Sequence, residues 1–291
     1  MQFTLKNEKL TLTVDSLGAE MRNLQTADGV EYLWQGDPKY WGDRAPNLFP
    51  FIGRLTNDSY QYMGKTYPMG IHGFAAAKEF RAVCQQTDLL VLELSSDEEI
   101  QKSYPFDFCL RICYQLKGDT VNIGFTVENK GHCTMPFGIG GHPGFNVPLV
   151  EGERFDDYEL EFSVPCRPDR VGFTPAVYMN GEDKEYPLRD AAFIDLRHDL
   201  FDEDAIILKN MAREITLRSK VSGRGVTVTY PDLPYLGIWH WPKTDAPYVC
   251  IEPWTSLPSR QDIVEEFTCK SDMLHLAANK TYETTWSICV R

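Results

Sequence analysis

The stretch "TVNIGFTVEN", residues 120–129, shows the pattern that decides the fold class. Its apolar residues Val121, Ile123, Phe125 and Val127 occupy every second position, and the positions between them are mostly polar. Because successive side chains of a strand point to opposite faces of a sheet, this alternation predicts a half-buried antiparallel strand.

The same alternation recurs along the chain and predicts further strands. It is clearest in "KLTLTV" (9–14), "LLVLELS" (89–95), "EITLRS" (214–219), "GVTVTY" (225–230) and "TTWSICV" (284–290). The residues "LKGD" at 116–119 predict a hairpin turn that joins "FCLRICYQL" (108–116) to the strand at 120–129.

Helical periodicity is weak and confined to short stretches. In "SRQDIVEEF", residues 259–267, Ser259 is expected to cap a short helix. No repeat or Gly/Ser-rich linker divides the chain. We therefore expect a mainly β protein, a large antiparallel β-sandwich formed by a single domain over residues 1–291.

Composition restricts the kinds of partner. The chain has 42 acidic and 29 basic residues and a formal charge of −13, so its field repels nucleic acid and anionic membrane surfaces. The N-terminus lacks the pattern of a signal peptide, and no apolar run is long enough to span a bilayer, so we expect a cytoplasmic protein. The eight cysteines include no CxxC pair, and reduced thiols are expected.

Four segments each place one ionisable side chain among apolar, aromatic and glycine residues. They are "NLFPFIGRL" with Arg54, "GIHGFAA" with His72, "MPFGIGGHPGFNVPL" with His142 and "YVCIEPWTSLP" with Glu252. Such surroundings are costly for a charge unless a partner or a substrate compensates it. Each residue also has a structural interpretation, as an ion pair, a hydrogen-bonded histidine or the cap of a turn.

Taken together, these segments resemble a known family. The chain resembles the aldose 1-epimerase (mutarotase) family, and within it the LacX-like branch, over almost its whole length. The segments that carry the resemblance include "LGAEMRNLQTADGVEYLWQGDPKYW" (17–41), "NLFPFIGRLTND" (47–58), "GGHPGFNVPL" (140–149) and "PYLGIWHWPKTDAPYVCIEPW" (234–254). The resemblance implies a galactose mutarotase-like supersandwich with a sugar site in a groove on one sheet.

The resemblance also implies residue roles. His142 would be the general acid and Glu252 the general base, while Arg54, His72 and Asp204 would bind the sugar. The implied reaction opens the ring of a hexose and closes it from the other face, so it interconverts the α and β anomers. It implies a small-molecule sugar as the partner and neither a cofactor nor a metal ion.

Several alternatives stay open. Asp199, Asp202 and Glu203 lie close to Asp204 in the sequence, so a neighbouring acid could take its role. Ala76 stands where related sequences often have an arginine, which bears on the loop near His72. Aromatic residues that could pack against a sugar are Phe74, Trp239, Trp241 and Trp254.

Three other functions compete with mutarotation of a neutral hexose. The first is a mutarotase for hexose 6-phosphates, and the second is a non-catalytic sugar-binding protein on the same scaffold. The third is a metal site formed by His72, His142 and Glu252, a donor set that metal enzymes use.

Overall fold

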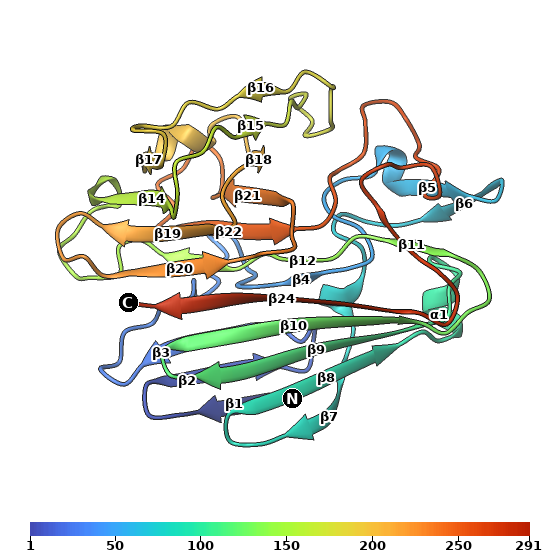
Figure 1. The fold of residues 1–291 in the computed structure, drawn as a ribbon, viewed down its shortest axis with the longest axis horizontal. Coiled ribbons are helices and arrows are strands. Elements are labelled where there is room, and N and C mark those ends of the chain that lie inside the picture. The colour runs from blue at the N-terminus through green and yellow to red at the C-terminus, as the bar shows by residue number, and fades with distance from the viewer.

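The computed structural model describes residues 1–291 and consists mainly of β-strands connected by turns and loops (Figure 1). Nine strands form the larger of two main sheets, and every neighbouring pair in it is antiparallel. In spatial order they are β17 (Phe193–Asp195), β14 (Tyr158–Phe162), β19 (Glu214–Ser219), β20 (Gly225–Thr229), β24 (Thr281–Val290), β10 (Thr120–Asn129), β9 (Phe108–Lys117), β8 (Leu89–Ser95) and β7 (Arg81–Gln85).

The second main sheet has eight strands and is also antiparallel. Its order is β16 (Lys184–Glu185), β15 (Asp169–Arg170), β18 (Ile206–Lys209), β21 (Tyr235–Trp239), β22 (Tyr248–Trp254), β12 (Gly140–Gly141) and β4 (Asn47–Leu48), with β13 (Gly144–Asn146) paired to β22.

Smaller elements complete the chain. A three-stranded sheet contains β1 (Gln2–Lys6), β2 (Leu10–Asp15) and β3 (Met21–Thr26). There are also two two-stranded sheets: the hairpin of β5 (Ser59–Tyr62) and β6 (Lys65–Pro68), and the long-range pair of β11 (Met135–Phe137) and β23 (Leu274–Leu276). The helices are α1 (Glu98–Gln101) and four 3₁₀ turns, η1 (Thr56–Asp58), η2 (Ala75–Ala77), η3 (Phe155–Asp157) and η4 (His198–Phe201). No helix is long and apolar enough to cross a membrane.

The two main sheets share one hydrophobic core, which confirms the predicted β-sandwich. The main core cluster contains 65 buried residues and draws on both sheets, with Ile123 and Phe125 from β10 and Ile251 from β22. Gly141 of β12 lies against Trp286 of β24, and a Cβ at this glycine would come within 2.5 Å of the indole ring. Figure 1 shows β12 and β4 running alongside β24 at this junction.

The alternation in residues 120–129 explains which face of β10, an interior strand between β24 and β9, is buried. Val121, Ile123, Phe125 and Val127 are all buried, as predicted. Across the strand pair Ile123 faces Trp286 of β24, so large apolar side chains meet on the core face. Burying each such side chain contributes about 1.5–3 kcal/mol.

The helix predicted over residues 259–267 is wrong, because this segment forms a loop. Its backbone bonds to distant segments: Ser259 N–H donates to the Arg54 carbonyl at 2.9 Å, and Gln61 N–H donates to the Glu265 carbonyl at 2.8 Å. The Ser259 hydroxyl accepts from the backbone of Thr56 instead of capping a helix. These tertiary contacts outweigh a weak local helical pattern.

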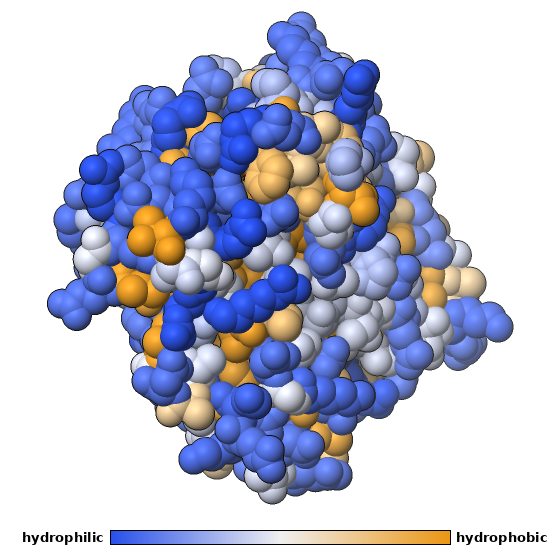
Figure 2. Space-filling model, turned by 60° about the vertical axis from the view of Figure 1, so that its left-hand side comes forward, coloured by the Kyte–Doolittle hydropathy of each residue, from blue (hydrophilic) through white to orange (hydrophobic).

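The outer surface is largely hydrophilic. Figure 2 shows one face on which apolar residues form small separate groups between hydrophilic ones. Exposed large apolar side chains are scattered along the chain, among them Met63, Val221 and Trp241. This distribution agrees with the high content of acidic residues.

Candidate active site

Strand β22 carries two different faces and is buried along its whole length. Val249 and Ile251 point into the main core, whereas Cys250 and Tyr248 belong to a separate cluster on the opposite face of the sheet. Glu252 follows Cys250 by two residues and therefore lies on that opposite face. The candidate site is thus on the outer face of the eight-stranded sheet, under a cover of loops.

The neighbouring strand makes room for the Glu252 side chain. Gly237 of β21 pairs with Glu252, and a Cβ at this glycine would lie 3.2 Å from the Glu252 Cβ and 3.0 Å from the Trp254 ring. A side chain at position 237 would therefore crowd both residues of the site.

His142 is held in the short connection between β12 and β13. Gly140 pairs with Trp254, and Gly144 pairs with Cys250, so the connection spans the part of β22 that carries Glu252. A Cβ at Gly140 would lie 2.7 Å from the Pro253 carbonyl oxygen, which explains why this position requires a glycine.

This arrangement brings together two residues that are far apart in the sequence. The ring nitrogen Nε2 of His142 lies 3.1 Å from Oε2 of Glu252, and the exposed fractions of the two side chains are 10% and 2%. The two atoms are within ion-pair distance but are not aligned for a hydrogen bond. Glu252 Oε2 therefore lacks a hydrogen-bond partner, and so does the other ring nitrogen of His142, Nδ1.

Burial shifts the two pKa values in opposite directions. It raises the pKa of Glu252 well above its ordinary value, and the charge of Asp204 raises it further. It also lowers the pKa of His142 well below its ordinary value, and protonation of the neighbouring His72 would lower it further. Burial therefore disfavours the charged form of each side chain, and the pair combines a group that can donate a proton with one that can accept it.

His72 lies beside this pair on a strained turn. Its φ is 62°, and it exchanges two hydrogen bonds with Gly53: His72 N–H donates to the Gly53 carbonyl at 2.9 Å, and Gly53 N–H donates to Nδ1 at 3.1 Å. The ring centroids of His72 and His142 are 5.4 Å apart. Burial and the charge of Arg54 lower the pKa of His72 to about 4, so the ring is neutral and carries its proton on Nε2.

Arg54 and Asp204 stand at the edge of the site. The Arg54 side chain is exposed and forms no hydrogen bond or ion pair, which removes the structural ion-pair interpretation. Asp204 is half-buried, has a φ of 72° and accepts a hydrogen bond from the backbone of Ala205.

The acidic residues near Asp204 in the sequence act on the pKa values of different side chains. The charge of Asp204 acts on Glu252, whereas that of Asp202 acts on His240 and that of Asp199 on His198. Of these acids, Asp204 is the one whose charge acts on Glu252, and it stays the candidate for binding the sugar.

Tryptophan rings line the space around His142. The Trp41 ring lies over the imidazole, with centroids 4.9 Å apart, and Trp239 meets it edge-on at 5.7 Å. Trp254 borders His72 at 6.5 Å. Phe74 instead packs against Phe49 and other aromatic residues of the main core.

The comparison with known families agrees with this geometry. The family model described as aldose 1-epimerase matches residues 1–267. The chain belongs to the aldose 1-epimerase family. It is therefore an enzyme of the isomerase class.

Relatives in this family cover the whole chain. The chromosomal LacX protein of Lactococcus lactis subsp. lactis is 36% identical over 297 residues, which cover 98% of this chain and 99% of the relative. The structure of a galactose mutarotase related enzyme from Lactobacillus acidophilus is 35% identical with a TM-score of 0.95, and the alignment covers 100% of this chain and 97% of that one. A galactose mutarotase-like protein from Lactobacillus casei is 31% identical with a TM-score of 0.93 over 100% of both chains.

The backbone of the His142 connection in this aldose 1-epimerase family member rests on the segment before β4. His142 N–H donates to the Pro46 carbonyl at 3.0 Å, and Gly144 N–H donates to the Arg44 carbonyl at 2.8 Å. Both bonds fix the connection on the side away from β22.

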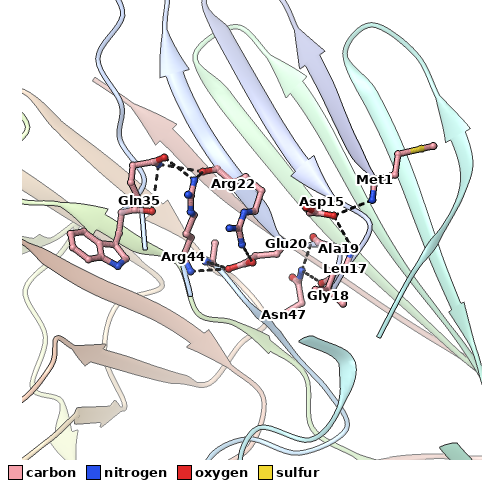
Figure 3. Close-up of polar contacts among 12 residues, drawn as sticks. Met1, Asp15, Leu17, Gly18, Ala19, Glu20, Arg22, Gln35, Arg44 and Asn47 are labelled. Carbon is pink, nitrogen blue, oxygen red and sulfur yellow. Dashed lines mark hydrogen bonds and ion pairs between the residues drawn. The ribbon is translucent and has the colours of Figure 1, made fainter. Parts of the chain in front are cut away.

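A polar network in turn holds that segment (Figure 3). The backbone N–H groups of Arg44 and Ala45 donate to Oε1 of Glu20 at 2.8 and 2.9 Å, and Arg22 donates to the other oxygen of the same carboxylate. The Arg44 guanidinium donates to the Arg22 carbonyl and to the Gln35 side chain, each at 2.7 Å. Glu20 therefore positions His142 through the backbone, without reaching it.

Sequence reasoning missed two residues of the site. Nothing in the sequence around Trp41 links it to His142. Cys250 is one of eight cysteines that form no CxxC pair, but the alternation of β22 places it on the same face as Glu252. That alternation was the signal that could have identified it.

Proposed function

We propose that the protein is a mutarotase that interconverts the α and β anomers of a hexose by opening and closing its ring. The observation that carries this proposal is the buried pair of His142 and Glu252, with Nε2 and Oε2 3.1 Å apart. Ring opening needs a base at the O1 hydroxyl and an acid at the ring oxygen, and such a pair supplies both.

In the proposed reaction Glu252 takes the proton of the O1 hydroxyl while His142 gives a proton to the ring oxygen. The ring bond between C1 and the ring oxygen breaks, and C1 becomes an aldehyde. After rotation about the C1–C2 bond, His142 takes the proton back from the former ring oxygen as that oxygen attacks C1. Glu252 then returns its proton to O1, so both residues end in their starting states.

This sequence requires the proton of the pair to be on His142 when the sugar reacts. Burial favours a protonated Glu252 in the free site, as its raised pKa indicates. Hydrogen bonds from sugar hydroxyl groups to the carboxylate favour its ionised form. We therefore infer that sugar binding moves the proton from Glu252 to His142.

The remaining candidates bind the sugar in this proposal. The unpaired guanidinium of Arg54 donates to hydroxyl or carbonyl oxygens, and His72 donates through Nε2, since its Nδ1 is occupied by Gly53. Asp204 accepts from a hydroxyl group. Trp239 and Trp41 offer ring surfaces for the apolar face of a pyranose.

Polarimetry on freshly dissolved α-glucose and α-galactose tests this function. Addition of the enzyme should speed the approach to the equilibrium rotation well beyond the rate in buffer alone. A sugar-binding protein without catalysis would bind the same hexoses, as calorimetry would show, but would leave the rate at the buffer value. That result would refute the proposed function.

A further inference from the structure

Cys250 is a fully buried thiol that the proposed proton transfers do not use. A ring nitrogen of His142, the Cys250 sulfur and a carboxylate oxygen of Glu252 all lie within 4.8 Å of one another. Nitrogen, sulfur and oxygen donors therefore converge at the point where the sugar would react. His72, which the sequence suggested as a ligand, is not part of this group.

We propose that these three side chains bind Zn²⁺, or a divalent transition metal ion of similar chemistry, and that the bound ion inhibits the enzyme. Cysteine, histidine and carboxylate are the side chains that bind Zn²⁺ in proteins, and three protein ligands with one open position form a common type of site. Ca²⁺ and Mg²⁺ favour shells of six or more oxygen ligands, so this donor set discriminates against them.

The state of Glu252 supports an interaction with a cation. Its side chain is 2% exposed, and Oε2 has no hydrogen-bond partner. A buried polar atom without a partner is unfavourable, because it loses the hydrogen bonds that water would provide. A metal ion among the three donors would be such a partner.

The surroundings of His142 Nδ1 favour a reversibly bound inhibitory ion over a metal ion that belongs permanently to the enzyme. Histidine ligands of a metal almost always donate their second N–H to a carbonyl or carboxylate, which orients the ring. Nδ1 of His142 has no such partner. We therefore expect reversible binding that EDTA abolishes.

Inhibition follows because two of the ligands of the ion, Glu252 and His142, are also the proton carriers of the proposed reaction. A metal ion bound to Glu252 and His142 uses the electron pairs that would accept protons from the sugar. Mutarotation would then stop until the ion dissociates. This consequence rests on the proposed function, whereas the binding of the ion does not.

Titration of the EDTA-dialysed full-length protein with Co²⁺ tests the binding. We expect one equivalent of Co²⁺ to produce a thiolate-to-cobalt charge-transfer band in the near ultraviolet, and Zn²⁺ to displace it. The band should be lost in Cys250→Ser and kept in Cys109→Ser, a matched control that is equally buried but lies in β9. An unchanged band in Cys250→Ser would mean that other thiols, such as the exposed Cys133 and Cys269, bind the ion, and would overturn the proposal.

A second measurement uses the wild-type protein and does not depend on the folding of a variant. X-ray absorption spectroscopy of the wild-type protein loaded with one equivalent of Zn²⁺ should show a single sulfur ligand together with nitrogen or oxygen ligands. A ligand shell without sulfur, or with more than one sulfur, would contradict the site.

Inhibition is tested by mutarotation at rising Zn²⁺ concentrations, relative to each variant's own metal-free rate. The Zn²⁺ concentration that halves the rate of mutarotation should be at least tenfold higher for Cys250→Ser than for the wild-type enzyme. If Zn²⁺ binds at Cys250 but the rate of mutarotation does not fall, the proposed inhibition is wrong. A protein that shows the Co²⁺ band but no mutarotation at all would support the metal site and refute the proposed function.

Discussion

Nε2 of His142 and Oε2 of Glu252 lie 3.1 Å apart on the outer face of the eight-stranded sheet, although 110 residues separate them in the sequence (252 − 142 = 110). Both side chains are buried, and neither Glu252 Oε2 nor His142 Nδ1 has a hydrogen-bond partner. A site in this state is prepared to exchange protons with a molecule that enters it.

Glu252→Gln and His142→Asn should each lower kcat for mutarotation by about 10²-fold or more, since each removes a proton carrier. Circular dichroism should show an unchanged fold. Glu159→Gln is the matched control: Glu159 is also buried, but it pairs with Arg189 and Arg218 on the nine-stranded sheet. Near wild-type rates in either site variant would remove that residue from the mechanism.

His72→Asn should raise KM and also lower kcat. The Nε2 proton of His72 is free to bind the sugar because Nδ1 accepts from Gly53 N–H at 3.1 Å. Loss of the imidazole therefore weakens sugar binding in the ground state, which raises KM, and weakens it further in the transition state, which lowers kcat. Steady-state kinetics on α-galactose would separate the two constants, and an unchanged KM would assign His72 a purely structural role.

Glu20→Ala should lower kcat without removing any group that contacts the sugar. Glu20 accepts from the backbone N–H groups of Arg44 and Ala45, whose segment supports His142. The variant leaves these buried donors unsatisfied and should lower the free energy of unfolding by about 1–3 kcal/mol.

Glu20→Gln is the matched comparison, because its amide oxygen can still accept these two bonds. It should recover most of the lost kcat. If Glu20→Ala loses stability but keeps the wild-type kcat, the network is structural and does not position His142.

Stability should fall between pH 7 and pH 5 because His240 is buried in its neutral form. His240 Nδ1–H donates to the Trp241 carbonyl, so Nε2 accepts from Nδ1–H of His198 at 3.1 Å. Burial lowers the pKa of His240 to about 4, with smaller opposing effects from its bond to Trp241 and from Asp202. Below the ordinary pKa of about 6.5 the unfolded chain binds a proton that the native state does not.

The free energy of unfolding should therefore decrease as the pH falls through this window, by about 2 kcal/mol for this group between pH 7 and pH 5. Urea titrations at the two pH values would measure the decrease. His240→Gln should show a decrease that is smaller by about that amount. An equal decrease in both proteins would show that His240 does not contribute.

An unphosphorylated hexose should be preferred over its 6-phosphate. Arg54 is the only basic residue among Arg54, His72, His142, Asp204 and Glu252 that is charged at neutral pH, and a phosphate site usually needs several converging donors. The formal charge of −13 also repels a dianion, although salt screens this field beyond about 8 Å.

Values of kcat/KM for α-glucose and for glucose 6-phosphate at matched ionic strength provide the test. A preference for the phosphate of more than about tenfold, or about 1.4 kcal/mol of transition-state binding, would instead identify a hexose-6-phosphate mutarotase.

The sequence alone was sufficient for the class of fold. The alternation in residues 120–129 encodes which face of β10 is buried, because this information lies in neighbouring residues. The same kind of local reasoning failed for residues 259–267, where the partners of the backbone are Arg54 and Gln61. A pattern of neighbouring residues gives no information about hydrogen-bond partners that are so distant in the sequence.

The site divides in the same way. The sequence determined which residue types were available: an imidazole among glycines at position 142 and a carboxylate among apolar residues at position 252. Their alternation with Val249 and Ile251 even determined that Cys250 and Glu252 share a face. Only the tertiary structure decided that His142 meets them and that Trp41 covers the imidazole. The physical reason is that these contacts depend on the pairing of β12 and β13 with β22, which long-range packing selects and no local pattern records.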